Sequence, residues 1–204
     1  AHSLFRTYLP LDISSSSMAR YSEKFGKPSI VADASRLPFQ DSSIDAIFTH
    51  SFLEHPTSPS KVLDEIVRVL KPGGIVYHND AWFVRWWHRF GVRDVYRFSE
   101  CGVAGKLIYV LSSITELKVF RASIVIPQRL FKKMFRAGAE SPLRYRRLRP
   151  NYDLHLYCDE DAASSIDPVD VLAFYEIRGF ENVEKLGLKE YLLHRNRGIL
   201  LRKT

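Results

Sequence analysis

Residues 44–78 alternate between two apolar patterns, and this alternation limits the chain to a small set of folds. Residues 44–49 are nearly all apolar, as in a strand that is covered on both faces. Apolar residues then recur at helical spacing until a cation, a proline and two glycines end the predicted helix: Val62, Leu63, Ile66, Val69 and Leu70, followed by Lys71-Pro72-Gly73-Gly74. A second apolar strand follows at residues 75–78. This order predicts two parallel strands joined by a crossover helix.

The same alternation continues on both sides of this unit. Helices are expected at about 14–25 and 168–178, and strands at 8–13, 30–32, 154–158, 180–186 and 199–202. We therefore predict an α/β fold with a Rossmann-like, doubly wound and mostly parallel sheet. A chain of 204 residues has room for one such domain with an insertion. The predicted core comprises residues 1–81 and 151–204, and residues 82–150 form a helical cap.

The net charge of +7 is concentrated in this insertion. Residues 82–150 contain 15 Lys/Arg and four Asp/Glu, which gives +11. Residues 1–81 contain eight against nine, and residues 151–204 contain seven against ten, which gives −1 and −3. The insertion is therefore expected to attract phosphates or an anionic membrane surface.

Several classes of site are disfavoured by the sequence. The two cysteines, Cys101 and Cys158, lie far apart and outside any His/Cys cluster, so neither zinc nor a disulfide framework is expected. The sequence contains no phosphate-binding Gly-x-x-x-x-Gly-Lys loop, no Gly-x-Ser-x-Gly turn and no His-Glu-x-x-His pair. Its longest apolar run, residues 107–111, is too short to cross a membrane, and residues 1–8 do not resemble a signal peptide. We expect a cytoplasmic protein.

Polar residues at the strand ends carry a family resemblance. Asp12, Asp33, Asp45, the Leu37-Pro38-Phe39 turn and Lys71-Pro72-Gly73-Gly74 occur at spacings that resemble class I S-adenosylmethionine (SAM) methyltransferases, in particular the small-molecule branch of quinone biosynthesis. The resemblance covers residues 8–80 well and 152–202 loosely. It implies SAM as the cofactor and a small-molecule methyl acceptor.

The resemblance also implies roles for individual residues. Asp12 would accept hydrogen bonds from the ribose hydroxyls, with Ile13 packed on the adenine. Asp33 would accept from the adenine amino group, while the backbone N–H of Ala34 donates to the ring. His50 and Ser51 would line the methionine end. For Asp12 and Asp33 the alternatives are a helix N-cap and a turn-forming aspartate.

No catalytic residue is assigned from the sequence. Glu54 and His55 resemble a family loop in which either residue would act as a general base, although bracing of the loop is the commoner role of such a pair. Thr49-His50-Ser51-Phe52 stands where methyltransferases of adenine amino groups have Asn/Asp-Pro-Pro-aromatic. Methylation of a base amino group is therefore disfavoured.

In this family a Gly-rich turn follows the first strand, whereas Gly26 is the single glycine among the first 32 residues here. We therefore expect the chain to begin partway through its cofactor domain. The family's sheet order, 3-2-1-4-5-7-6, then predicts a gap between the strand that ends at Asp12 and the strand that ends at Thr49.

Two amphipathic segments stand out in the insertion. Residues 82–90 place Trp and Phe on one helical face, and residues 130–135 place Leu130, Phe131, Met134 and Phe135 opposite Arg129, Lys132, Lys133 and Arg136. We expect a lid that buries the aromatic residues and leaves the cations in water. The alternatives are a membrane contact through residues 82–136 and, third, an RNA surface. Arg144, Arg146, Arg147 and Arg149 are candidates to bind a phosphate-bearing substrate.

The sequence thus predicts methyl transfer from SAM to an oxygen or carbon of a small hydrophobic or anionic acceptor. The alternative is a non-catalytic methyltransferase-like module that binds a membrane surface or a partner through its basic aromatic insertion. Neither the acceptor nor the oligomeric state follows from the sequence.

Overall fold

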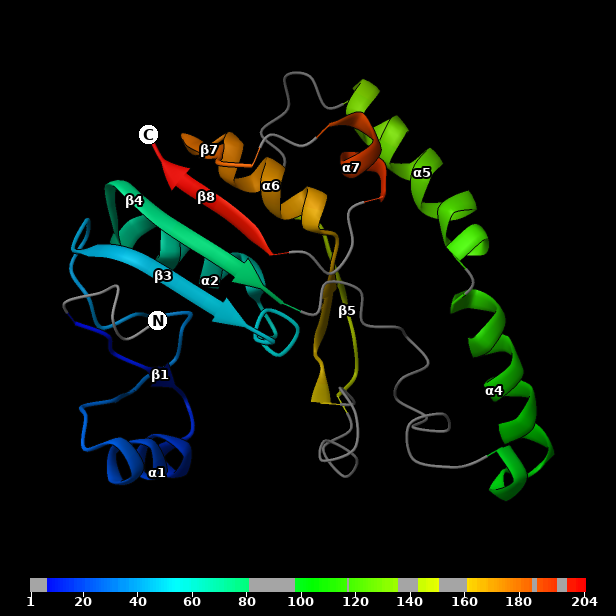
Figure 1. The fold of residues 1–204 in the computed structure, drawn as a ribbon, viewed down its shortest axis with the longest axis horizontal. Coiled ribbons are helices and arrows are strands. Elements are labelled where there is room, and N and C mark those ends of the chain that lie inside the picture. Colours follow the sequence, from blue (N-terminus) through cyan, green and yellow to red (C-terminus); the bar gives the residue numbers. More distant parts are fainter. Residues whose placement is uncertain are drawn as a thin grey trace.

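The structure, a computed structural model, describes residues 7–80, 98–116, 118–135, 143–150, 161–184, 187–193 and 198–204. These residues form an α/β fold (Figure 1). The largest sheet has the strand order β3-β4-β8-β7, with β3 (Ile44–His50), β4 (Leu70–Asn79), β7 (Phe180–Asn182) and β8 (Ile199–Lys203). β3 is parallel to β4, and β8 is antiparallel to both β4 and β7. Three of the four strands therefore run in one direction, which confirms the predicted mostly parallel sheet.

Two short strands form a separate parallel sheet, β1 (Leu11–Asp12) with β2 (Ile30–Val31). They are connected by α1 (Ser15–Phe25), which begins after the N-cap Ser14 and ends at Gly26 in the left-handed conformation. Among the described strands none joins β1 to β3. Within the described residues these strands therefore belong to two separate sheets.

The core lies on one face of the four-stranded sheet. Helices α2 (Pro59–Val69) and α6 (Pro168–Glu176) pack there against Val76 of β4 and Leu201 of β8. Side chains alternate along the strands, so Phe48 and its neighbour Tyr77 lie on the opposite face, where Phe48 is exposed. The apolar periodicity of α2 therefore identified its buried face correctly.

The Lys71-Pro72-Gly73-Gly74 segment ends α2 but also enters the strand pairing. β4 begins at Leu70 instead of the predicted Ile75, and the pairing with β3 shifts between Ile44 and Ala46. Gly73 has a positive φ of 78°, and a Cβ on Gly74 would lie 2.8 Å from the Lys71 carbonyl oxygen. Both glycines are thus required by this irregular turn.

Three described elements were not predicted. Strands β5 (Tyr145–Arg147) and β6 (Ser164–Ile166) form an antiparallel pair, and α7 (Leu188–Leu193) lies between β7 and β8. The strands lack alternating apolar residues, and the backbone N–H of Ser164 donates to the Glu54 carbonyl, a partner far away in the sequence. The strand predicted at residues 154–158 lies outside the described residues.

The insertion contains a short 3-10 turn, η2 (Phe98–Glu100), and two helices, α4 (Val103–Glu116) and α5 (Lys118–Phe135). The helices lie end to end along one side of the molecule, with α5 beside α7 (Figure 1). The aromatic segment 82–90 lies outside the described residues. No described helix is long and apolar enough to span a bilayer.

The expected orientation of α5 is wrong. Arg129, which we expected on the solvent side, is 0% exposed, whereas Phe131 and Met134 are 63% and 72% exposed. The Arg129 guanidinium donates to both carboxylate oxygens of Asp167, the N-cap of α6, and to the carbonyl oxygens of Tyr191 and Leu192 in α7. These acceptors satisfy the buried charge and fix α5 to α6 and α7.

Replacing Arg129 by Met should lower the free energy of unfolding by roughly 3–5 kcal/mol, because Asp167 and two carbonyl oxygens would stay buried without their donor. Arg146→Met, at an exposed position of β5, is the matched control and should change stability by less than about 0.5 kcal/mol. Urea unfolding followed by circular dichroism measures both. Equal stability of the two variants would contradict the role of Arg129 as an anchor.

Candidate functional site

The carboxyl ends of β1 and β2 bring together the residues of the predicted adenosine site. Asp12 pairs with Val31 in the parallel register, and the N–H of Ala32 donates to the Asp12 carbonyl oxygen at 3.1 Å. Asp33 and Ala34 follow directly, so both aspartates lie at one edge of the small sheet. Asp33 and Asp12 are both exposed. Their common edge is where open α/β sheets bind ligands.

Each aspartate also organises its own turn. Oδ1 of Asp12 accepts from the Ser14 N–H, and Oδ1 of Asp33 accepts from the Ser35 N–H, both at 2.8 Å. The N-cap of α1 is Ser14, not Asp12. These turns occupy one oxygen of each carboxylate and hold the side chains in place. Ile13, the middle residue of the first turn, is 73% exposed, as a surface for a flat aromatic ring would be.

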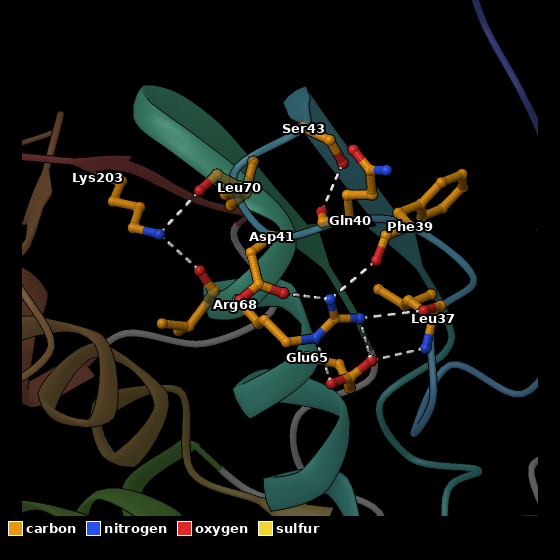
Figure 2. A network of polar contacts seen from close by, with 10 residues as sticks. Leu37, Phe39, Gln40, Asp41, Ser43, Glu65, Arg68, Leu70 and Lys203 are labelled. Carbon is orange, nitrogen blue, oxygen red and sulfur yellow. Dashed lines mark hydrogen bonds and ion pairs between the residues drawn. The ribbon is translucent and has the colours of Figure 1, made fainter.

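The turn after Asp33 is fixed to α2 by one arginine (Figure 2). Arg68 donates to the carbonyl oxygens of Leu37 and Phe39 and to the carboxylates of Asp41 and Glu65. Glu65 in turn accepts from the Leu37 N–H at 2.7 Å. The hydrogen bond from Arg68 lowers the pKa of Glu65, so this carboxylate is ionised at neutral pH. The Leu37-Pro38-Phe39 turn is therefore held in place by α2.

His50 and Ser51 lie at the carboxyl ends of the larger sheet. His50 is opposite Asn79 in the β3–β4 register, and the Ser51 N–H donates to the Asn79 carbonyl oxygen at 3.1 Å. Ser51 has a positive φ of 45°, an uncommon conformation for a residue other than glycine. Both side chains are exposed. Backbone strain of this kind is characteristic of functional loops.

A buried polar cluster beneath this edge was not predicted. Thr49 Oγ1 donates to Asp80 Oδ2 and lies 2.7 Å from His78 Nδ1, while His78 Nε2 lies 3.0 Å from the Tyr175 hydroxyl. If Tyr175, His78 and Thr49 each carry one proton in this cluster, the Tyr175 hydroxyl donates to His78 Nε2, His78 Nδ1 donates to Thr49, and Thr49 donates to Asp80. Burial raises the pKa of Tyr175 well above its ordinary value, and the nearby Asp80 carboxylate adds to this effect, so Tyr175 keeps its proton.

Asp80 ends this chain and also binds the loop after β3. Its Oδ1 accepts from the backbone N–H groups of Phe52 and Leu53 at 2.9 and 3.3 Å. Burial raises the pKa of Asp80, but hydrogen bonds from His78, Thr49 and Phe52 outweigh burial and leave it below the ordinary value. The sequence signal was a polar pair, Asn79-Asp80, directly after an apolar strand.

His55 stands between two carboxylates at the same edge. Its Nδ1 lies 3.2 Å from Asp161 Oδ2, and its Nε2 lies 3.8 Å from Glu54 Oε1. The His55 side chain is 35% exposed, whereas Glu54 is buried. His55 is therefore oriented by an acidic partner and reachable from solvent. Within the described residues no group of three His, Cys, Asp or Glu side chains is arranged to hold a metal ion.

Comparison with known proteins agrees with this geometry. Residues 1–78 match the family model described as a methyltransferase domain. The ubiquinone/menaquinone biosynthesis C-methyltransferase UbiE of Laribacter hongkongensis is 37% identical over 81 residues, which are 40% of this chain and 33% of that protein. The malonyl-[acyl-carrier protein] O-methyltransferase of a Marinomonas species is 39% identical over 72 residues, 33% of this chain and 27% of that protein. This chain thus spans about a third of the length of these relatives.

Parallel strands with carboxylates at their carboxyl ends place polar side chains where open α/β sheets bind ligands. Residues 1–78 match the methyltransferase domain family and resemble SAM-dependent methyltransferases. The cofactor of that family is SAM. The described residues fit its adenosine half, because Asp12 and Asp33 each keep a second carboxylate oxygen outside their own turns and Ile13, next to Asp12, offers an exposed apolar surface.

The lowered pKa of Asp80 predicts how the stability of the fold depends on pH. An aspartate whose folded-state pKa is depressed stabilises the fold above its unfolded value of 3.8, and this stabilisation is lost as the pH falls through the folded-state value. Asp80→Asn should therefore cost about 1–3 kcal/mol at pH 7, and the difference from wild type should shrink below about pH 4. Urea titrations at several pH values measure it.

Asp45→Asn is the control for this experiment. Asp45 forms an exposed ion pair with Lys71 at 2.7 Å, which contributes at most about 1 kcal/mol. A difference between wild type and Asp80→Asn that stays constant from pH 7 to pH 3 would show that the Asp80 charge is not what stabilises the loop.

Proposed function

We propose that the protein transfers the methyl group of SAM to an oxygen or carbon atom of a small acceptor. The observation that supports this proposal most directly is the placement of Asp12 and Asp33 at one edge of the β1–β2 sheet. Two carboxylates on adjacent parallel strands match the two polar regions of an adenosine, the ribose diol and the amino group of the base.

The chain's residues then divide the cofactor between them. Asp12 accepts from the ribose hydroxyls and Ile13 packs on the adenine. Asp33 accepts from the adenine amino group, and the backbone N–H of Ala34 donates to the ring. His50 and Ser51, at the carboxyl end of β3, line the methionine end. When bound, SAM supplies a methyl group activated by its sulfonium charge.

The names of the relatives support an acceptor of low molecular weight or one presented on a carrier. One relative is a C-methyltransferase of ubiquinone and menaquinone biosynthesis and the other is an O-methyltransferase of a malonyl thioester. Positioning the acceptor against the methyl group supplies most of the catalysis in such a reaction. The basic strand β5, with Arg146 and Arg147 exposed, is our candidate for an anionic part of the acceptor.

His55 is our candidate for the proton acceptor of the reaction. An oxygen or carbon nucleophile loses a proton when it is methylated, and His55 is the exposed imidazole at this edge that a carboxylate orients. Asp161 would be the positioning residue, because its carboxylate lies 3.2 Å from Nδ1 and so orients the imidazole ring. This arrangement requires no metal ion.

Asp12→Ala should weaken SAM binding by roughly 1.5–3 kcal/mol, because a charge-assisted contact to the ribose is lost. This change corresponds to about 10- to 150-fold in Kd. Titration calorimetry on the longest natural form of the protein that contains these residues measures it. Asp45→Ala, at the opposite end of β3, should bind SAM as the wild type does. Unchanged affinity in Asp12→Ala would remove Asp12 from the site.

Asp33 can be tested by changing the base. If Asp33 accepts from the adenine amino group, wild type should bind S-adenosylhomocysteine at least about tenfold more tightly than S-inosylhomocysteine, which has a carbonyl oxygen there. Asp33→Ala should remove this preference and leave the affinity for the inosine compound nearly unchanged. An equal loss for both compounds would indicate that Asp33 only shapes its turn.

A further inference from the structure

Helix α4 presents a stripe of aliphatic side chains to solvent. Five residues share this face, with exposed fractions of 88, 60, 44, 52 and 44%: Val103, Leu107, Val110, Leu111 and Ile114. Their spacing of four, three, one and three residues keeps them within about 100° of the helix circumference. Single exposed apolar residues are ordinary, but five on one helix face mark an interaction surface.

Helix α5 also exposes four large apolar side chains. Their exposed fractions run from 39 to 72%: Ile124, Leu130, Phe131 and Met134. The opposite side of α5 is fixed to the domain, because Arg129 is buried against Asp167 and the carbonyl oxygens of α7. The exposure of the apolar side is therefore set by a buried ionic anchor on the other side of the same helix.

The charge of these helices indicates what covers the apolar face. In sequence, α5 contains five Lys/Arg and no Asp/Glu, and α4 contains one lysine and one glutamate. One of the five, Arg129, is paired with Asp167, which leaves four cations in α5. The whole insertion carries +11. Apolar residues on one face combined with an excess of cations are the composition of helices that lie in the interface of an anionic bilayer.

We propose that α4 and α5 form a docking surface for an anionic membrane, with the aliphatic face, defined by the nine apolar residues above, inserted among the lipid headgroups. Neither helix crosses the bilayer. A protein partner would fit this surface less well, because lysine is depleted at protein interfaces whereas lipid phosphates attract it. Through its contacts with Asp167 and Tyr191, Arg129 would keep α5 in a fixed orientation relative to α6 and α7 on the membrane.

The test is co-sedimentation with vesicles of phosphatidylcholine that contain about 30% phosphatidylserine. Wild type should sediment with these vesicles and much less with pure phosphatidylcholine, and raising the salt from about 0.1 to 0.5 M should release it. The double variant Leu107→Glu and Leu111→Glu should bind at least about tenfold more weakly, because two charges would enter the apolar layer.

Ile177→Glu with Val183→Glu is the matched control. Ile177 is 51% exposed and Val183 is 43% exposed, and both lie near α6 and β7, outside the aliphatic face. This variant therefore adds the same charge elsewhere and should bind the vesicles as wild type does. Retained binding by the Leu107/Leu111 variant, equal loss in the control, or salt-independent binding to neutral vesicles would each overturn the proposal. Sedimentation velocity without lipid completes the test, since a wild-type dimer that the Leu107/Leu111 variant abolishes would identify the face as a contact between two copies.

Discussion

The contact between Arg68 and the turn after β2 holds the β1–β2 pair to the helix that packs on the larger sheet. The β1–β2 pair shares no strand pairing with β3 among the described residues, so backbone hydrogen bonds do not fix its place. Arg68 and Glu65 of α2 instead bind both backbone groups of Leu37 and the carbonyl of Phe39 (Figure 2). An exposed ion pair alone would contribute little. The Arg68–Glu65 pair stabilises the turn because it also forms hydrogen bonds with the backbone groups of Leu37 and Phe39.

A second polar cluster fixes a loop to the sheet at the carboxyl ends of β3 and β4. Asp80 joins the end of β4 to the loop after β3 through the N–H groups of Phe52 and Leu53. Beneath it, His78 and Thr49 connect this loop to Tyr175 of the core helix α6. Because every partner is buried, a change in one group leaves another unsatisfied. The loop that carries the proposed proton acceptor is thus supported by the core.

In the insertion, the sequence correctly predicts an amphipathic helix but not which side of it is buried. The sequence of α5 is amphipathic, and from this the apolar side was expected to be buried. Arg129 reverses that expectation, because Asp167 and two helix carbonyls form an acceptor site that only a guanidinium fills. The apolar side therefore faces outward, and this exposure is the basis of the proposed membrane contact.

By itself the sequence determined the strand-helix alternation, the ends of α1 and α6, and the aspartates at the carboxyl ends of β1 and β2. These features depend on residues within a few positions of each other, through periodicity, caps and turn chemistry. Only the tertiary structure decided the burial of Arg129, the His78–Tyr175 contact and the pairing of β5 with β6. Their partners are 38 to 97 residues away or offer only backbone atoms, so no local pattern encodes them.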